Sequence, residues 1–311
     1  MPLDNTWIAV DWGTSNLRAW MMGPDGPRAQ AVSDDGMGKL TPDAFEPALL
    51  RLIEPWLIAP VNQVPVTQAP PIRVLACGMV GARQGWREAA YRTVPCTPVD
   101  AAGVLHVPTQ DHRITFHIAP GLRQDRPADV MRGEETQVAG ALALNPGFDG
   151  VICAPGTHSK WMQVSAGEVV SFQTYMTGEL FALLSGQSVL RHSMVVDGTE
   201  AWDDASFDAG LSDALSRPDR IAARLFSLRA EFLLHGMPPA EGRARLSGLL
   251  IGIELAGAKP YWLGQKVILI GAPALAASYI RALSQQGLTA ETLDATACTL
   301  AGLSALHKGM T

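Results

Sequence analysis

The sequence lacks a long hydrophobic segment, a basic excess and a dense set of cysteines. No apolar run reaches the roughly 18 residues that a membrane-spanning helix needs, so we expect no membrane partner. Lys and Arg number 24 against 30 Asp and Glu, a net charge of −6, which argues against nucleic acid as a partner. The four cysteines form no CxxC pair and no basic, apolar leader begins the chain. We therefore expect reduced thiols in a cytoplasmic protein.

Familiar phosphate and nucleophile motifs are also missing. No G-x-G-x-x-G occurs, and the nearest match to a Walker loop, residues 36–40, lacks the Ser or Thr after Lys39. No G-x-S-x-G surrounds Ser159, which argues against a nucleophile elbow. With 47% hydrophobic and 17% charged residues, the 311-residue chain is typical of a globular protein of about two domains.

The sequence does contain a pattern that occurs twice, 143 residues apart when counted from Gly13 to Gly156. In the first copy, apolar residues 7–10 lead into Asp11 and a polar turn, and a second apolar run follows. In the second copy, apolar residues 151–153 lead into a similar turn, again followed by an apolar run. Two strand–turn–strand hairpins half a chain apart predict a duplicated α/β domain with a boundary near residues 135–150.

Hydrophobic periodicity predicts the remaining elements. We expect helices over residues 42–57, 178–192, 205–236, 246–257, 274–286 and 295–307, and strands over residues 72–77, 113–118 and 267–270. A further helix follows Gly133, with Glu134 and Glu135 in its first turn, where the helix dipole favours carboxylates.

Each Gly-Thr turn can present backbone N–H groups and hydroxyls to phosphate oxygens. Asp11, at the end of the preceding strand, offers the oxygen ligand that Mg²⁺ prefers. One such turn alone is more typical of a plain β-hairpin, but its repetition and the cation of Lys160 favour a phosphate site.

Five segments, taken as a set, resemble the 2-keto-3-deoxygalactonate kinase family of the actin, Hsp70 and sugar-kinase superfamily. They are residues 8–20, 77–86, 129–137, 155–161 and 176–179. The resemblance implies two ribonuclease-H-like lobes of the actin-like ATPase fold with a central cleft. The N-terminal lobe, residues 1–140, would bind sugar and phosphate, and the C-terminal lobe, residues 141–311, would bind phosphate and adenosine. The implied reaction is ATP- and Mg²⁺-dependent phosphorylation of a small sugar acid, 2-keto-3-deoxygalactonate, at its C6 hydroxyl, in galactonate breakdown.

The resemblance also implies roles for single residues. Asp11 would hold the metal, and Glu135 or Glu134 would be the general base, with Glu135 matching slightly better by its spacing to the small-residue helix. Phosphate and adenosine would contact Gly13, Thr14, Ser15, Asn16, Gly156, Thr157, His158, Ser159, Lys160, Gly271 and Ala272. The sugar acid would contact Gly78, Met79, Arg83, Gln84, Gly85, Trp86 and Arg18, with Trp86 stacking on the sugar and Arg83 or Arg18 taking its carboxylate.

Three alternatives stay open at this point. The chain could phosphorylate another sugar acid with the same fold, because a fold does not determine a substrate. It could be a non-catalytic sugar-binding sensor, or a polyphosphatase-like hydrolase, whose helix also starts with Gly-Glu-Glu. The sequence also leaves open a homo-oligomer.

Overall fold

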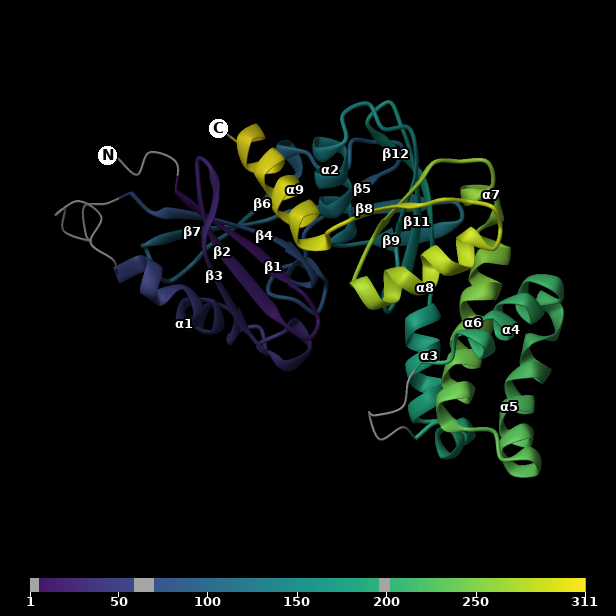
Figure 1. Ribbon diagram of the computed structural model, residues 1–311. Helices are drawn as coiled ribbons and strands as arrows, with labels where there is room; N and C mark the ends of the chain where they lie inside the picture. The colour runs from purple at the N-terminus through teal and green to yellow at the C-terminus, as the bar shows by residue number, and fades with distance from the viewer. Residues whose placement is uncertain (1–5, 59–69, 196–201, 311) are drawn as a thin grey trace. The chain divides into compact units, whose positions relative to one another are not determined.

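The computed structural model describes residues 6–58, 70–195 and 202–310, which form two compact units (Figure 1). The first unit comprises residues 1–148, 165–171 and 295–311, and the second comprises residues 149–164 and 172–294. This division differs from the expected one at residues 140/141. The chain first enters the second unit after Phe148, and its last helix belongs to the first unit.

The first unit is built on a six-stranded sheet. Its strands are β1 (Trp7–Trp12), β2 (Leu17–Gly23), β3 (Gly26–Ser33), β4 (Ile72–Gly78), β6 (Leu105–Val107) and β7 (Ile114–Ile118), in the order β3-β2-β1-β4-β7-β6. β1 and β2 form the expected antiparallel hairpin, whereas β1, β4 and β7 run parallel. The carboxyl ends of β1 and β4 therefore meet at one edge of the sheet.

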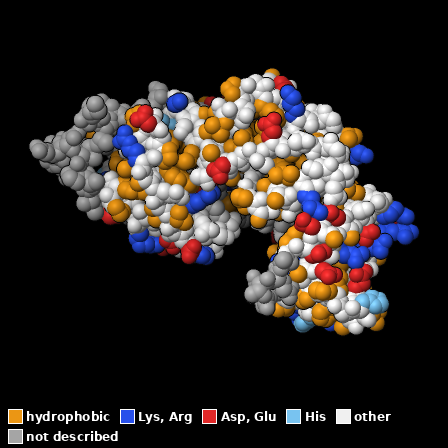
Figure 2. All heavy atoms as spheres, viewed as in Figure 1, with side chains coloured by type: hydrophobic (Ala, Val, Ile, Leu, Met, Phe, Trp, Pro, Cys, Tyr) orange, Lys and Arg blue, Asp and Glu red, His pale blue; other side chains and the backbone are white. Residues whose placement is uncertain are grey.

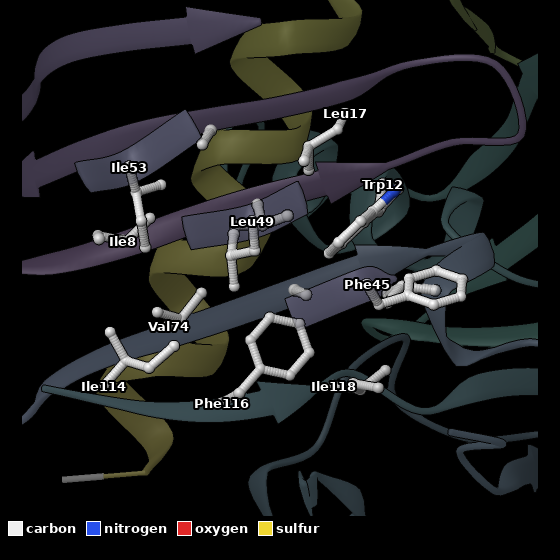
Figure 3. Close-up of a cluster of buried hydrophobic side chains, with 14 of the residues drawn as sticks. Ile8, Trp12, Leu17, Phe45, Leu49, Ile53, Val74, Ile114, Phe116 and Ile118 are labelled. Atoms are coloured by element: carbon white, nitrogen blue, oxygen red, sulfur yellow. The ribbon is translucent and has the colours of Figure 1, made fainter. Parts of the chain in front are cut away.

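Helices cover both faces of this sheet. They are α1 (Phe45–Ile58) and α9 (Ala295–Gly309). Because side chains alternate along a strand, Ile8 and Trp12 pack with Leu49 in the α1 core (Figure 3), whereas Trp7 packs with Leu306 on the α9 side. By the same alternation, Asp11 projects to the face that α9 covers.

A second helix of the first unit, α2 (Glu134–Leu144), packs directly on α9. A Cβ added to Gly140 would lie 1.8 Å from the carbonyl oxygen of Cys298, and one added to Gly302 would lie 1.9 Å from that of Thr136. The two backbones are thus in contact, which fixes the start of α2. An unpredicted three-stranded sheet, β5 (Tyr91–Thr93), β8 (Gly121–Asp125) and β9 (Ala128–Met131), leads the chain into α2.

The sheet of the second half repeats the topology of the first. Its strands are β10 (Gly150–Ala154), β11 (Ser159–Ser165), β12 (Glu168–Tyr175), β13 (Val267–Ile270) and β14 (Glu291–Leu293), in the order β12-β11-β10-β13-β14. This is the order β3-β2-β1-β4-β7 with each strand replaced by its counterpart. The antiparallel β10–β11 hairpin and the parallel β10–β13 pair also correspond to β1–β2 and β1–β4. The predicted duplication is confirmed.

The described part of the second unit also contains several helices. They are α3 (Thr177–Gly186), α4 (Asp204–Ser216), α5 (Ile221–His235), α6 (Pro239–Gly257), α7 (Lys259–Trp262) and α8 (Pro273–Ser284). The single helix expected over residues 205–236 is wrong. Arg217 is non-helical, with φ −142° and ψ 68°, because the ring of Pro218 disfavours the helical conformation before it.

Acidic and basic side chains interleave over α4–α6 (Figure 2), for example where Arg245 pairs with Glu231 at 2.7 Å and with Asp213 at 3.5 Å. Among the described residues, no helix has the length and apolar character that crossing a membrane requires.

Candidate active site

Three chain segments meet at the carboxyl ends of β1 and β4. Trp12 and Gly78 are register partners in this parallel pair. A Cβ on Gly78, whose φ is +91°, would lie 2.7 Å from the Trp12 carbonyl oxygen and 3.4 Å from Asp11 Oδ1. A Cβ on Gly133, at the N-cap of α2, would lie 3.3 Å from the Gly78 Cα. The absence of side chains at both glycines lets β1, the glycine-rich loop and α2 approach one another.

Asp11 forms an ion pair with Arg18, its partner across the hairpin. Arg18 also donates from Nη1 to Thr296 Oγ1 at 3.4 Å. Burial raises the pKa of Asp11, Arg18 opposes this rise, and the charge of Glu134 adds to it. Arg18, predicted as a substrate ligand, has Asp11 as its partner in this structure.

The two carboxylates at the start of α2 have different surroundings. Glu134 is half-buried and accepts from the Arg132 backbone N–H at 3.1 Å. Glu135 is 0% exposed and accepts from the Gly133 N–H at 2.7 Å and from the Thr136 hydroxyl at 3.2 Å. Burial, together with the Glu134 charge, raises the pKa of Glu135 to about 8. The helix dipole at the start of α2 favours an ionised carboxylate, and at Glu135 burial opposes this effect.

The first polar turn, residues 13–16, is supported from outside by residues 36–38. Gly13 and Thr14 accept through their carbonyl oxygens from the N–H groups of Met37 and Gly38, both at 2.9 Å. The Asn16 side chain donates to Asp34 at 3.1 Å. Thr14 and Ser15 are exposed. Their hydroxyls are therefore accessible on a braced turn, whereas the side-chain amide of Asn16 already has a partner.

The glycine-rich loop, residues 78–86, exposes only part of its predicted sugar ligands. The Trp86 ring packs on Phe116 at 4.4 Å between centroids and on Phe45 at 6.2 Å, so Trp86 belongs largely to the α1 core. Gly85 is buried and Met79 is half-buried. Gln84 is exposed, and the side chain of Arg83 is 81% exposed, 3.5 Å from Glu88. The accessible part of this loop is thus its Arg83–Gln84 tip.

Arg132, which precedes the start of α2, is buried beside this loop. It donates from Nη2 to the Ala89 carbonyl oxygen at 2.7 Å, and its guanidinium lies 4.3 Å from the Tyr91 ring centroid. No hydrogen-bond partner is found for Nε or Nη1 within the described parts of the chain. Its charge lowers the pKa of Glu135, in opposition to burial. Arg132 therefore links the region of the glycine-rich loop to the start of α2.

The second polar turn, in the other unit, is held by the start of α3. A Cβ on Gly178 would lie 2.3 Å from the Gly156 carbonyl oxygen, so the two backbones are in contact. Glu179 donates its N–H to Thr157 at 3.0 Å, and its carboxylate lies 2.5 Å from His158 Nε2. Thr157 and His158 are exposed. The two sequence motifs at residues 155–161 and 176–179 thus form one substructure.

Two predicted phosphate ligands of this turn are buried. Ser159 is 0% exposed and its hydroxyl lies 2.9 Å from that of Tyr279. Lys160 is also buried and donates to the His158 carbonyl oxygen at 3.3 Å. These contacts favour a supporting role in the turn for both residues.

A cavity of about 820 Å³ opens beside this turn. Its walls come from the turn and from α3, α4, α6 and α8, and include Gly156, Thr157, Thr177, Phe181, Arg243 and Tyr279. Arg243 lies over the Phe181 ring at 5.1 Å. Gly271 and Ala272 were predicted to contact adenosine. A Cβ on Gly271 would lie 3.4 Å from the Pro155 carbonyl oxygen, so Gly271 borders the turn, and Ala272 next to it is exposed. The volume is in the usual range for a small-molecule site.

Within the described residues, no group of three or more His, Cys, Asp or Glu could form a metal site. Mg²⁺ in nucleotide sites is commonly held by one or two carboxylates together with substrate phosphates. The half-buried carboxylate of Asp11, beside a phosphate-type turn, fits that donor set.

The sequence profile of the 2-keto-3-deoxy-galactonokinase family matches residues 11–306. The chain belongs to this family. It is 40% identical over 309 residues to the probable 2-dehydro-3-deoxygalactonokinase of Rhizobium meliloti, covering 98% of this chain and 97% of that protein. It is 35% identical to the 2-dehydro-3-deoxygalactonokinase of Escherichia coli, covering 98% and 96%.

A crystal structure from Sinorhizobium meliloti, of a protein assigned as 2-dehydro-3-deoxygalactonokinase, is 39% identical and has a TM-score of 0.86, covering 98% of this chain and 99% of that one. The fold is that of the actin-like ATPases and sugar kinases, and the family is one of phosphotransferases. Every predicted site residue lies within the matched range.

Proposed function

We propose that this protein transfers the γ-phosphoryl group of ATP to the C6 hydroxyl of 2-keto-3-deoxygalactonate. The observation that carries this proposal is the family match over residues 11–306. A kinase family implies a nucleotide donor, and the cavity beside Gly156 has room for one. The sugar acid, its C6 position and Mg²⁺ are the further parts of this proposal.

In the proposed reaction, the substrate hydroxyl oxygen bonds to the γ-phosphorus, the bond from that phosphorus to ADP breaks, and the hydroxyl proton passes to a base. Glu134 is the better candidate for this base in the structure. It is partly exposed, whereas Glu135 is enclosed and burial raises the pKa of its carboxyl. A base must first reach the proton that it accepts, so accessibility favours Glu134.

The proposed phosphate ligands are the exposed groups of the two turns, namely Thr14, Ser15, Thr157 and His158. Asp11 would hold Mg²⁺, which would neutralise phosphate charge. Ser159 and Lys160 would stabilise the conformation of the second turn.

At the other end of the substrate, the proposed ligands are in the glycine-rich loop. The exposed Arg83 and Gln84 would contact the sugar acid, because guanidinium and amide groups suit a carboxylate and hydroxyls. Arg18 would serve as a carboxylate ligand only if it exchanged Asp11 for the substrate.

The test is a measurement of ADP release from ATP with a panel of sugar acids, with Asp11→Asn as the inactive control. We expect turnover with 2-keto-3-deoxygalactonate above that with its epimers. Turnover with another acid would redirect the substrate assignment. ATP hydrolysis without any acceptor would favour the hydrolase, and sugar binding without turnover would favour the sensor.

A further inference from the structure

A buried carboxylate outside the proposed chemistry connects the elements around the second turn. Glu254, in α6, is 1% exposed. Its Oε1 accepts from the indole N–H of Trp161 in β11 at 2.8 Å, and its Oε2 accepts from the hydroxyl of Tyr279 in α8 at 2.7 Å. The side chains of Thr177 and Ser159 also hydrogen-bond to it. The side chain of Glu254 therefore connects its own helix, α6, to strand β11 and to helices α3 and α8.

The proton directions in this network follow from the donors available. A tyrosine hydroxyl has one proton, and Tyr279 gives it to Glu254. Ser159, 2.9 Å from the Tyr279 oxygen and also bonded to Glu254, must direct its own proton to one of these two acceptors. Ser159 is enclosed, so its hydroxyl proton points into the network and away from solvent. This explains why Ser159 does not present a donor to phosphate.

Part of this network borders the cavity beside the second turn. Thr177 and Tyr279 line it, and Ser159 directly follows the exposed Thr157 and His158 of the turn. Thr177 is the first residue of α3, the helix that holds the turn through Gly178 and Glu179. A shift of the Glu254 carboxylate would thus move the turn, the start of α3 and α8 with respect to each other.

We infer that Glu254 is a positioning residue for nucleotide binding, which holds the turn, the first residue of α3 and α8 in one arrangement by accepting hydrogen bonds from Trp161, Tyr279, Thr177 and Ser159. This inference rests on the proposed function only for the identity of the nucleotide.

The chemistry of the site favours glutamate over other residues. Burial raises the pKa of Glu254, and the hydrogen bonds from Thr177, Tyr279 and Trp161 counteract the rise. An ionised carboxylate only accepts hydrogen bonds, which matches a set of surrounding donors. A glutamine would turn its amide N–H₂ toward one of these donors, and an apolar residue would leave the donors unpaired. A role in packing alone would be met more simply by an apolar side chain, since burying a charge is costly.

The test compares Glu254→Gln and Tyr279→Phe with a matched control, Ser193→Ala. Ser193 is also 0% exposed in the second unit, and within the described residues its hydroxyl makes a local hydrogen bond, to the Leu190 carbonyl oxygen at 3.0 Å. The measurements are the KM for ATP, the KM for the sugar acid, the thermal midpoint, and the rise of that midpoint with a non-hydrolysable ATP analogue.

We expect Glu254→Gln and Tyr279→Phe to raise the KM for ATP roughly tenfold, because each removes a hydrogen bond that involves a charged group. The KM for the sugar acid should stay within about twofold. The analogue-induced rise in midpoint should shrink, because it depends on nucleotide affinity. The double variant should raise the KM for ATP by less than the product of the two single-variant increases, because both changes affect one network. Ser193→Ala should change the midpoint alone.

The inference is overturned if both variants lower the midpoint while their KM for ATP and their response to the analogue match Ser193→Ala. If Glu254→Gln does not fold, Tyr279→Phe and Ser159→Ala apply the same test one hydrogen bond at a time. A wild-type protein that binds the analogue but phosphorylates no sugar acid would refute the proposed function and leave the positioning role intact. A wild-type protein that does not bind the analogue would refute both.

Discussion

Replacing Glu135 by glutamine tests how α2 presents its carboxylates. In the folded protein the pKa of Glu135 is raised from 4.5 to about 8, so the fold favours the protonated form. The stability linked to this group is present below pH 4.5 and is lost as the pH rises toward 8. The unfolded chain loses this proton at a lower pH than the folded protein. The free energy of unfolding of the wild type should therefore fall by about 3 kcal/mol between pH 5 and pH 8.

Glutamine imitates the protonated carboxyl and does not titrate. It can accept from the Gly133 N–H with its oxygen and donate to the Thr136 hydroxyl with its amide, the two groups that Glu135 contacts. Glu135→Gln should therefore match the wild type at pH 5 within about 1 kcal/mol and exceed it at pH 8 by about 3 kcal/mol. For a unit of this size, that difference corresponds to a shift in thermal midpoint of roughly 5 to 10 °C.

The assay is the thermal midpoint of both proteins at intervals from pH 5 to pH 8, with Asp25→Asn as the control. Asp25 is exposed at the tip of the β2–β3 hairpin, so its amide variant should follow the wild-type curve. Parallel wild-type and Glu135→Gln curves would refute the reasoning, because they would mean that Glu135 is ionised in the fold. A variant less stable than the wild type at pH 8 would refute it as well.

Four further predictions concern the proposed site. Glu134→Gln should lower turnover by roughly 100- to 10,000-fold in single-turnover assays, the usual range for a lost base, whereas Glu135→Gln should stay active. Asp11→Asn should lower kcat at least about 100-fold in Mg²⁺ titrations, with the KM for sugar kept. Gly78→Ala should lower the free energy of unfolding in urea by roughly 2 to 4 kcal/mol, because a Cβ there would lie 2.7 Å from the Trp12 carbonyl oxygen. His158→Gln should raise the KM for ATP about tenfold in initial-rate assays, because it removes a proposed phosphate contact.

Each of these predictions has a contradicting result. An active Glu134→Gln with an inactive Glu135→Gln would return the base to Glu135, as its spacing in the sequence favours. Wild-type turnover of Asp11→Asn at saturating Mg²⁺ would reject the metal role. A stable Gly78→Ala would mean that the loop can move away from β1, and an unchanged KM in His158→Gln would remove that side chain from the phosphate contacts.

The sequence was sufficient to predict the duplicated sheet because its signals are local. Each hairpin combines alternating apolar residues with a Gly-Thr turn, and both appear where expected, as β1–β2 and β10–β11. The three-stranded sheet was missed because its strands are short and partly exposed, so they have little hydrophobic pattern. The interruption at Arg217 had a visible signal in Pro218, which the helical periodicity on both sides obscured.

The surroundings of the candidate site residues were less predictable, because they depend on distant packing. Glu135 lies in α2, a helix that packs on α9, which lies more than 150 residues further along the chain. Trp86 was expected at the sugar but packs on Phe45 and Phe116 in the core. For Glu254, the only signal was one acidic residue inside the apolar run from Leu246 to Ala258, whose partners come from three other elements.

The most direct test of the account is mass analysis of the products formed from ATP and 2-keto-3-deoxygalactonate by the wild-type protein. We predict one ADP for each sugar acid that gains a phosphoryl group, with the phosphorus attached at C6 and with no ADP formed when the sugar acid is omitted. ADP formation that does not depend on the sugar acid, or an unmodified sugar acid after prolonged incubation with ATP and Mg²⁺, would contradict it.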